Sequence, residues 1–359
     1  MSMVAYQKNL LNGIKILELA GLAPSSFCGL VLADFGAEVT VIQKVYNKSN
    51  FEERLIRNKN VISVNLKTAE GLQSVKELCR ISDVLIDPYR PGVLEKIGLD
   101  PVELMKDNRR LVVIRITGYG QVGEMASAAG HDINYVGLSD NILPMIAGRS
   151  NKQAPYWTPA NLLGDFAGGS FLAAFAIVSA LHHRDKTGDN GFIIDLSMVE
   201  GISYLSSFVS VYQDLDVLWH QPYAIFSGNC PIYRTYETLD NKFVAVGALE
   251  EKFSSLLFRT LGVSFKQEDL FVKSAEVVAL LEKIFKTKSR NEWTEIFKDV
   301  DACVSPVVDI DELGNIKHHQ KRGSFMKQNN KYIPLPAPRF YTREEFESLR
   351  AANNRKFDS

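Results

Sequence analysis

The sequence predicts an α/β protein with a large, doubly wound parallel-sheet domain of the Rossmann-like kind and a smaller α+β domain. Three observations lead to this expectation. Short β-rich runs alternate with helical segments through the first third of the chain, and the pattern changes after about Gly228. In addition, 359 residues exceed the usual size of a single hydrophobic core.

The first third of the chain predicts the sheet. Strands are expected at 14–19, 38–42, 61–66, 84–87 and 111–116, and helices at 25–35, 69–80 and 101–106. Strands separated by helices pair in parallel, so the pattern favours an open doubly wound sheet. Ligands of such sheets lie beyond the carboxyl ends of the strands. The loops after Leu19, Ile42, Asp87 and Ile116 are therefore the first candidates for a site.

The remainder divides into a helical region and a smaller domain. Residues 164–210 are expected to be helical, with a strand-like insert at 191–196. Antiparallel strands at 231–238 and 242–247, joined by the turn dipeptide Asp240-Asn241, precede helices at 251–261 and 275–286. The expected domains are 1–200 (first part of the large domain), 201–227 (linker helix), 228–311 (small α+β domain) and 312–359 (return segment toward the large domain).

Composition excludes several classes of function. The net charge is −1, so nothing in the overall charge favours nucleic acid or an acidic membrane surface. The four cysteines form no CxxC pair, which argues against a metal site and a disulfide framework. No apolar run is expected to span a membrane, and 166–181 is predicted to be a buried helix. Neither terminus carries a clear targeting signal, so we expect a soluble intracellular protein.

The first strand–helix–strand unit argues against a nicotinamide enzyme. The turn reads Gly21-Leu22-Ala23-Pro24, which lacks the G-x-G-x-x-G pattern, and the second strand ends at Lys44 where an NAD enzyme needs an acid. A lysine there suits a phosphorylated ribose, such as that of coenzyme A, although a solvated surface lysine is an equally ordinary explanation.

More cations occur in loops beyond the expected strand ends, and together they favour a phosphate site. For any one of them alone, a solvated charge is the simpler explanation. Arg90, in the rigid turn Arg90-Pro91-Gly92 directly after a strand, is the strongest candidate. The other members are Lys48, Arg54, Arg57 and Lys59.

His131 is the histidine placed best for chemistry. It precedes a helix-like run that starts at Ile133, and Gly130 permits a tight turn before it. Free backbone N–H groups near Asp132 are expected at that helix end, where they can stabilise an enolate oxygen. The alternative is that His131 is only a structural cap.

Two acids complete the candidate chemistry. Asp165 stands at the head of an almost wholly apolar helix, where burial raises a carboxyl pKa and makes the group a usable base. The alternative is a plain helix N-cap. Glu250 ends a strand of the smaller domain, and it either reaches the site or simply begins the next helix.

At these residues the sequence resembles the α-methylacyl-CoA racemases within the family III CoA-transferases. The matching segments run collinearly from about Gly13 to Ser324. They include Leu32-Ala33-Asp34-Phe35-Gly36-Ala37, Tyr89-Arg90-Pro91-Gly92, Gly130-His131-Asp132-Ile133-Asn134-Tyr135, Asp165-Phe166-Ala167-Gly168-Gly169 and Val246-Gly247-Ala248-Leu249-Glu250.

The resemblance implies a racemase that interconverts the epimers of 2-methylacyl-CoA thioesters and works as an interlocked homodimer. His131 and Asp165 are then the two bases, with Asp132 and Glu250 assisting. Gly130, Tyr135 and the cations are the contacts to coenzyme A, which is part of the substrate, so no separate cofactor is expected. The resemblance also implies a peroxisomal or mitochondrial location. The apolar residues Met145, Ile146 and Phe226 are candidate contacts for the acyl tail, although core residues are an equally ordinary explanation.

Two departures and two alternatives remain. The second strand of these racemases usually ends in arginine, and a Gly-Glu-His-Thr segment usual in the family is missing after Pro338. The first alternative is a CoA-transferase that uses Asp165 as a nucleophile and needs no His131. The second is a CoA-binding protein without catalysis.

Overall fold

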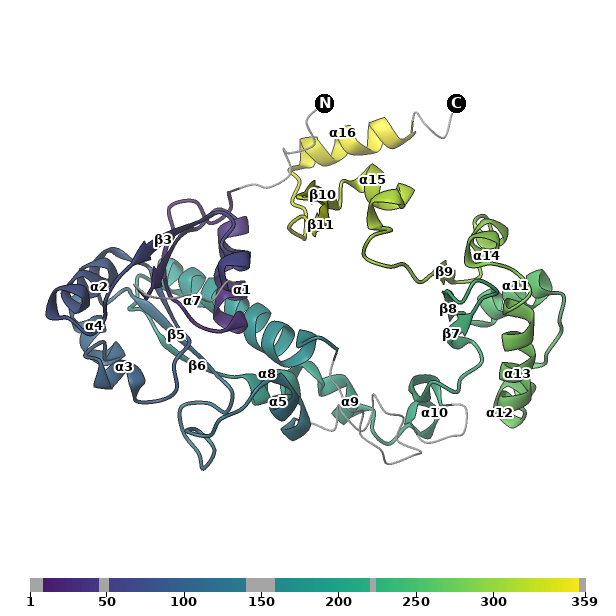
Figure 1. Ribbon diagram of the computed structural model, residues 1–359, viewed down its shortest axis with the longest axis horizontal. Coiled ribbons are helices and arrows are strands. Elements are labelled where there is room, and N and C mark those ends of the chain that lie inside the picture. The colour runs from purple at the N-terminus through teal and green to yellow at the C-terminus, as the bar shows by residue number, and fades with distance from the viewer. Residues whose placement is uncertain (1–8, 45–51, 140–158, 220–223, 355–359) are drawn as a thin grey trace. The chain divides into compact units, whose positions relative to one another are not determined.

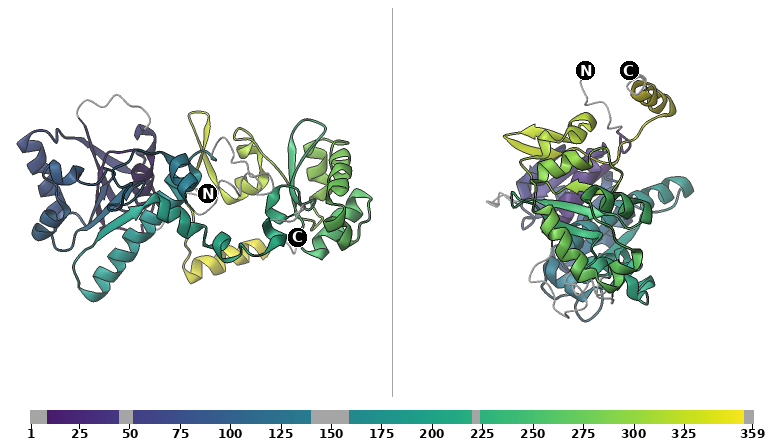
Figure 2. Two further views of the ribbon diagram at one scale, coloured as in Figure 1. Left: turned by 90° about the horizontal axis from the view of Figure 1, so that it is seen from below. Right: turned by 90° about the vertical axis from the view of Figure 1, so that its right-hand side faces the viewer.

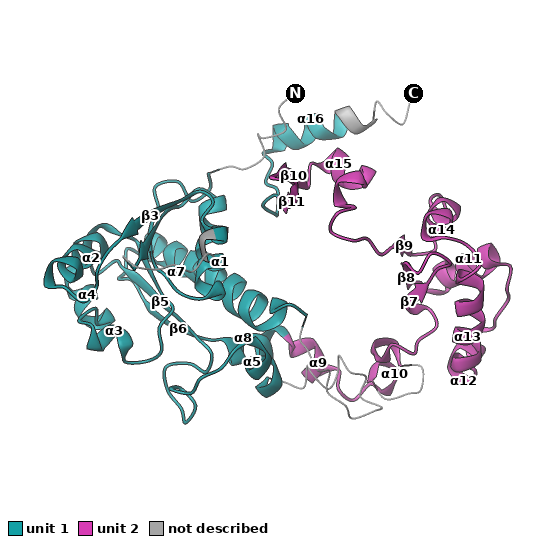
Figure 3. Cartoon of the chain, viewed as in Figure 1, with its two compact units in different colours: residues 1–139, 158–205, 335–359 teal, residues 140–157, 206–334 magenta. Residues whose placement is uncertain are grey.

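The computed structural model describes residues 9–44, 52–139, 159–219 and 224–354. Lys48, Met145 and Ile146 therefore lie outside the described residues. The described chain forms two compact units (Figure 3). Unit 1 contains the described residues up to 139, then 159–205 and 335–354, and unit 2 contains 206–219 and 224–334.

Unit 1 is built on a six-stranded parallel sheet (Figure 1). The strands are β1 (Lys15–Leu19), β2 (Glu38–Gln43), β3 (Lys59–Ser63), β4 (Val84–Asp87), β5 (Val112–Thr117) and β6 (Ile193–Ser197). Their order in the sheet is β3-β2-β1-β4-β5-β6, so the direction of winding reverses between β1 and β4. The predicted doubly wound parallel sheet is confirmed, and the strand-like insert at 191–196 is its sixth strand.

Helices cover the sheet on its two faces (Figure 1, with two further views in Figure 2). Helix α1 (Ala23–Asp34) contacts β1, β2 and α7 (Leu172–Thr187). Helices α2 (Ala69–Ile81), α3 (Val93–Lys96) and α4 (Pro101–Asp107) share a buried cluster with the strands that includes Leu17, Val75 and Leu104. Helices on both faces bury strands β4 and β5 along their whole length, and most residues of these two strands are apolar; the exceptions are Asp87, Arg115 and Thr117.

A π-helix (Leu162–Phe171) continues directly into α7 and packs on α8 (Met198–Leu205) through glycines. A Cβ at Gly201 would lie 2.1 Å from the carbonyl oxygen of Gly168, so neither position has space for a side chain. This close approach fixes the helix that carries Asp165.

By length and composition the continuous helix Leu162–Thr187 could cross a membrane. The helix is longer than the predicted 166–181, because the π-helical turns and α7 form one helix, and the expectation that it does not span a membrane stays a prediction. One face of it is buried, including Ala173 and Ile177. The Ser170 hydroxyl also donates to the Pro24 carbonyl oxygen (2.7 Å), which joins the helix to the start of α1.

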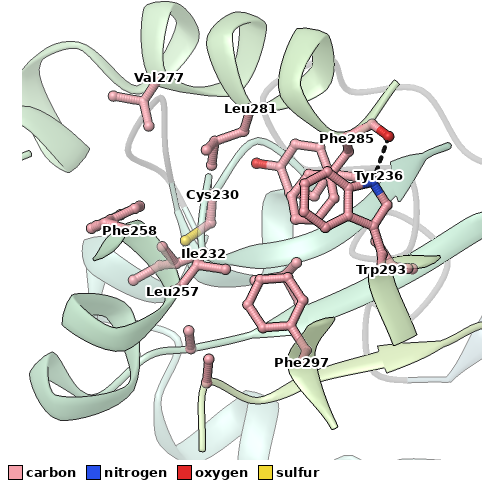
Figure 4. Packing of buried hydrophobic residues seen from close by; sticks show 14 of the residues in the cluster. Cys230, Ile232, Tyr236, Leu257, Phe258, Val277, Leu281, Phe285, Trp293 and Phe297 are labelled. Atoms are coloured by element: carbon pink, nitrogen blue, oxygen red, sulfur yellow. Dashed lines mark hydrogen bonds between the residues drawn. The ribbon is translucent and has the colours of Figure 1, made fainter. Parts of the chain in front are cut away.

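Unit 2 is an α+β unit. Strands β7 (Tyr233–Glu237), β8 (Phe243–Gly247) and β9 (Val304–Pro306) form an antiparallel sheet, which confirms the predicted pair of strands and adds a third. Around its core lie α11 (Glu251–Leu261), α12 (Gln267–Val272), α13 (Ser274–Phe285) and α14 (Arg290–Phe297). In that core Tyr236 stacks on Phe285, and the Trp293 indole N–H donates to the Phe285 carbonyl (2.8 Å; Figure 4).

Helices and a hairpin precede and follow the sheet of unit 2. Helices α9 (Ser207–Val211) and α10 (Asp216–Trp219) precede the unit 2 sheet, and α15 (Lys317–Arg322) and the hairpin β10 (Phe325–Gln328)–β11 (Lys331–Pro334) follow it. After the hairpin the chain returns to unit 1 with α16 (Arg343–Asn354), and the Phe340 ring meets the Phe35 ring edge to face at 5.8 Å.

Candidate active site

A pocket of about 350 Å³ lies in unit 1 at the carboxyl ends of β1, β4, β5 and β6. Residues that follow each of these strands line it: Leu22, Pro24 and Ser25 after β1, Pro88 and Arg90 after β4, Gly118 and Tyr119 after β5, and Met198 after β6. It therefore occupies the point where the strand order reverses, as expected for a ligand site of an open α/β sheet. Of the four predicted loops, those after Leu19, Asp87 and Ile116 contribute to it.

His131 stands at the start of α5 (Asp132–Leu138) and lines the pocket. Its backbone N–H donates to Asn134 Oδ1 (3.0 Å), so a residue one turn into the helix caps this end. The N–H groups of Asp132 and Ile133 belong to the first turn and have no acceptor within the helix. The predicted placement of His131 at a helix N-terminus is confirmed.

Asp165 lies in the first turn of the π-helix and lines the same pocket as His131. Its side chain is buried, and Oδ2 accepts from the Asn161 amide (3.0 Å). Burial raises the pKa of the Asp165 carboxyl, the Asn161 hydrogen bond opposes this, and the smaller charge effects of Asp132 and His131 act in opposite directions. The carboxyl thus holds a proton to higher pH than an exposed aspartate does, which suits a group that both removes and returns a proton.

Asp132 supports this helix rather than the pocket. Its Oδ1 accepts from the backbone N–H groups of Gly164 (2.7 Å) and Asp165 (2.9 Å), and the side chain is almost fully buried. A Cβ at Gly164 would lie 2.5 Å from that oxygen, so only glycine allows the contact. The residue next to His131 therefore holds the backbone of Asp165, a role that the sequence did not reveal.

Tyr135 and Gly130 fix the peptide that precedes His131. The Tyr135 hydroxyl donates to the Gly130 carbonyl (2.5 Å), and its ring meets Tyr119 edge to face at 5.2 Å. Burial, followed by the neighbouring Tyr119 and Asp165, raises the pKa of Tyr135 to about 12, so the hydroxyl stays a donor. Both Gly130 and Tyr135 line the pocket, and their contact with coenzyme A stays a prediction.

Of the five described cations predicted to hold coenzyme A, Arg90 lines the pocket. Its Nη1 lies 3.4 Å from the Ser127 carbonyl oxygen, a weak contact that leaves most of its donors available. Lys44 and Arg54 are exposed outside the pocket lining. Arg57 pairs with Asp34, with Nη2 at 2.5 Å from Oδ2.

Lys59 is not available to a ligand in this arrangement. Its ammonium is enclosed and donates to Glu18 Oε2 (2.7 Å) and to the Ser26 carbonyl (2.8 Å). Burial outweighs the attraction of Lys59 and raises the pKa of Glu18 to about 7. The long side chain of Lys59 reaches from edge strand β3 to β1 and lies against α1, so the structure gives no support to the predicted phosphate contact.

Two predicted contacts belong to unit 2. Glu250 is exposed and is the N-cap of α11, so its role toward His131 stays a prediction. Phe226 packs within unit 2 against Trp219, at 5.2 Å between ring centroids. Its contact with an acyl tail also stays a prediction.

Comparison with known proteins identifies the family. The model of CoA-transferase family III matches residues 11–354. A CaiB/baiF CoA-transferase family protein of Caenorhabditis elegans is 50% identical over 94% of this chain and 98% of its own length. The α-methylacyl-CoA racemase of Mus musculus is 42% identical over 92% of this chain and 85% of its own length.

Solved structures show the same fold. A CAIB/BAIF family protein of Brucella suis has a TM-score of 0.73 at 21% identity and covers 96% of this chain and 100% of its own length. The resemblance stated from the sequence motifs is therefore confirmed, and the chain belongs to CoA-transferase family III.

Proposed function

We propose that the protein is an epimerase that interconverts the (R)- and (S)-forms of 2-methylacyl-CoA thioesters. The observation that carries the proposal is the pairing of His131 and Asp165 in one pocket at the sheet switch point, from two different helices. The 42% identity to the mouse and human α-methylacyl-CoA racemases supports the same activity.

The mechanism is a two-base proton transfer. His131 removes the α-proton from one epimer, the C–H bond breaks, and its electron pair moves onto the thioester oxygen to give an enolate. Asp165, as a carboxylic acid, then delivers a proton to the opposite face of the same carbon. In the reverse direction Asp165 removes the proton and His131 returns it. Coenzyme A is part of the substrate, so no further cofactor enters the reaction.

The enolate oxygen needs a donor that does not have to reorganise. His131 is the N-cap of α5. The backbone N–H groups of Asp132 and Ile133, in the first turn of this helix, have no acceptor within the helix and are candidate donors. They lie beside the base that removes the proton, as predicted for an enolate site. The buried surroundings of Asp165 strengthen such interactions further, because water screens them less.

The CoA-transferase alternative uses the same aspartate differently. A transferase needs Asp165 as an ionised nucleophile that forms an acyl anhydride, and His131 then has no part in the reaction. The presence of His131 in the same pocket as Asp165 favours the epimerase, because a transferase of this kind needs no histidine there.

We also propose a homodimer, on the basis of an apolar face that unit 1 leaves uncovered. Phe171, Phe175 and Val178 are 51%, 68% and 42% exposed and follow one another at helical spacing. A neighbouring copy of the chain would remove this stripe from water at about 25 cal/mol per Å² of apolar surface. An interlocked arrangement of the two copies is the form that the family resemblance implies.

The test is α-proton exchange in heavy water. Pure protein is incubated separately with the (R)- and the (S)-epimer of short, branched long-chain and bile-acid-type 2-methylacyl-CoA esters. We expect deuterium at the α-carbon together with inversion, and the panel identifies the preferred acyl chain. Transfer of coenzyme A to a free carboxylic acid, with an acyl-enzyme trapped by hydroxylamine and no exchange, would instead establish the transferase. Binding of coenzyme A without turnover on any ester would establish a non-catalytic binding protein.

A further inference from the structure

Three charged side chains lie beneath the loop that carries Arg90, and the proposed mechanism uses none of them. Arg115 points from the middle of β5 and is only 6% exposed. Asp87, at the end of β4, is fully buried, and Glu95 belongs to the short helix α3 that follows the loop. A buried guanidinium is costly unless carboxylates satisfy it, so this cluster calls for an explanation.

The cluster holds the beginning of the loop. Asp87 Oδ1 accepts from the Tyr89 backbone N–H (2.8 Å), and Asp87 Oδ2 accepts from Arg115 Nε (2.9 Å). Pro88, between them, packs on the loop after β1, where a Cβ at Gly21 would lie 2.3 Å from the Pro88 Cβ. The chain just before Arg90 is therefore fixed from two sides.

The same guanidinium holds the end of the loop. Arg115 Nη1 and Nη2 donate to the Glu95 carboxylate at 2.7 and 3.3 Å. Desolvation opposes ionisation of Glu95, but the Arg115 hydrogen bond and the backbone N–H groups of Glu95 and Gly92 lower its pKa overall, so it is a carboxylate at neutral pH. Gly92 itself turns at φ +77°, a conformation that suits glycine.

Arg90 is thus carried by a short loop whose two ends are fastened to one buried arginine. Its guanidinium lines the pocket and, among the described residues, makes one weak contact, to the Ser127 carbonyl. A long cationic side chain loses considerable conformational entropy when it binds an anion, and a rigid backbone beneath it reduces that loss. The stability of the fold alone does not explain these charges, because well-packed apolar residues of similar size in place of a buried ion pair often leave stability unchanged or increase it.

We propose that Asp87, Arg115 and Glu95 form a loop clamp, a set of positioning residues that holds Arg90 in place for the phosphate groups of an acyl-CoA substrate. The proposal rests on the proposed function, since it takes coenzyme A as the anion. It predicts that damage to the clamp weakens substrate binding through Arg90 and leaves the proton-transfer step intact.

The test is a double-mutant cycle of Glu95→Gln and Arg90→Ala. Glutamine keeps the shape of a partly exposed side chain and removes the charge that Arg115 binds. Free coenzyme A is the probe in calorimetry, and KM and kcat are measured with a 2-methylacyl-CoA ester. We expect Glu95→Gln to weaken coenzyme A binding and raise KM about fivefold, with kcat unchanged within about twofold.

In the Arg90→Ala background the same Glu95→Gln change should have no further effect on coenzyme A binding, because the Arg90 side chain through which the clamp acts is absent. Glu103→Gln is the matched control. It removes the exposed ion pair of Glu103 with Lys106 on α4, outside the pocket lining, and should leave both KM and coenzyme A affinity unaltered.

Equal losses from Glu95→Gln with and without Arg90 would overturn the clamp, and so would a fall in kcat at unchanged KM. A wild-type protein that binds coenzyme A, beside a Glu95→Gln variant that binds it equally well, would refute the clamp and leave the proposed function standing. A wild-type protein that binds no coenzyme A would refute both.

Discussion

Replacing Asp132 by alanine tests whether this residue, next to His131 in the chain, holds Asp165 in place. The change removes the oxygen that accepts from the Gly164 and Asp165 N–H groups in a buried position. A buried N–H left without a partner costs about 1–3 kcal/mol, so two cost about 2–6 kcal/mol. Asp132 Oδ2 has no hydrogen-bond partner among the described residues, and relief of that buried charge offsets part of the loss. We expect a net destabilisation of about 1–4 kcal/mol.

The functional consequence should appear in both exchange directions. A loosened first turn displaces Asp165 from the carbon that it must reach, and such misplacement of a general acid or base lowers the rate by about 10² or more. The assays are urea denaturation for stability and α-deuterium exchange with each epimer. Asp132→Asn separates charge from geometry, because the amide oxygen still accepts from the two N–H groups. It should retain most stability while lowering the pKa of Asp165, since the Asp132 charge contributes to raising it.

The matched control is Asp100→Ala. Asp100 caps α4 in the same way, with Oδ1 accepting from the Val102 N–H (2.8 Å), but it lies outside the pocket lining. It should lose about 1 kcal/mol of stability and no exchange activity. If Asp132→Ala and Asp100→Ala exchange α-deuterium equally well at comparable stability, Asp132 does not position Asp165 and the reasoning fails.

Three further predictions concern the bases and the assembly. His131→Ala should lower the rate of α-deuterium exchange about 10²–10⁴-fold for the epimer that His131 faces, while Asp165 still exchanges the other epimer. Asp165→Ala should show the opposite pattern. Equal losses for both epimers in each variant would indicate a one-base site or a covalent nucleophile. The kcat/KM for the epimer deprotonated by Asp165 needs the carboxylate, so it should fall as pH decreases through the raised pKa of this group. A pH–rate profile should place this acidic limb above the ordinary aspartate pKa of 3.8, and a limb at or below that value would contradict the raised pKa. If the protein forms the proposed homodimer, Phe175→Glu should convert it to monomers in light scattering, whereas a dimer of unchanged mass would exclude this face from the interface.

The fold was predictable from the sequence where periodicity is local. Strands β1, β4 and β5 correspond to short, mostly apolar runs bounded by turn residues, and burial on both faces of a parallel sheet explains this composition. Strand β3 begins two residues before its predicted start, because Lys59 and Asn60 are polar and resemble a loop although they pair with β2. The hairpin of β10 and β11 was missed altogether.

The hairpin was missed because its sequence carries no clear hydrophobic pattern. Its strands are only partly buried, so no alternation of apolar and polar residues marks them. The available signal was the dipeptide Asn329-Asn330, because asparagine tolerates the positive φ that both residues adopt. A two-residue turn of this kind between short segments is typical of a β-hairpin.

The sequence indicated which residues belong to the candidate site, but not which residues their side chains contact. His131 and Asp165 stand out locally, one before a helix and one inside an apolar helix. The pairing of Lys59 with Glu18 joins residues far apart in sequence, and a cation that follows a loop looks the same whether it meets a ligand or a buried carboxylate. The same limit applies to Arg115, which the sequence presents only as a charge within a strand.

The positions of the two predicted bases, His131 and Asp165, both depend on Asp132. Asp132 is adjacent to His131 and bonded to the backbone of Asp165, so one residue couples the helix that presents the histidine to the helix that presents the aspartate. A shift of α5 that moves His131 also moves the acceptor on which Asp165 depends. The charge of Asp132 adds to the burial that raises the pKa of Asp165, whereas Asn161 opposes it. Each base must both take a proton from the α-carbon and return one to it, and a carboxyl pKa above that of an exposed aspartate favours the return step for Asp165.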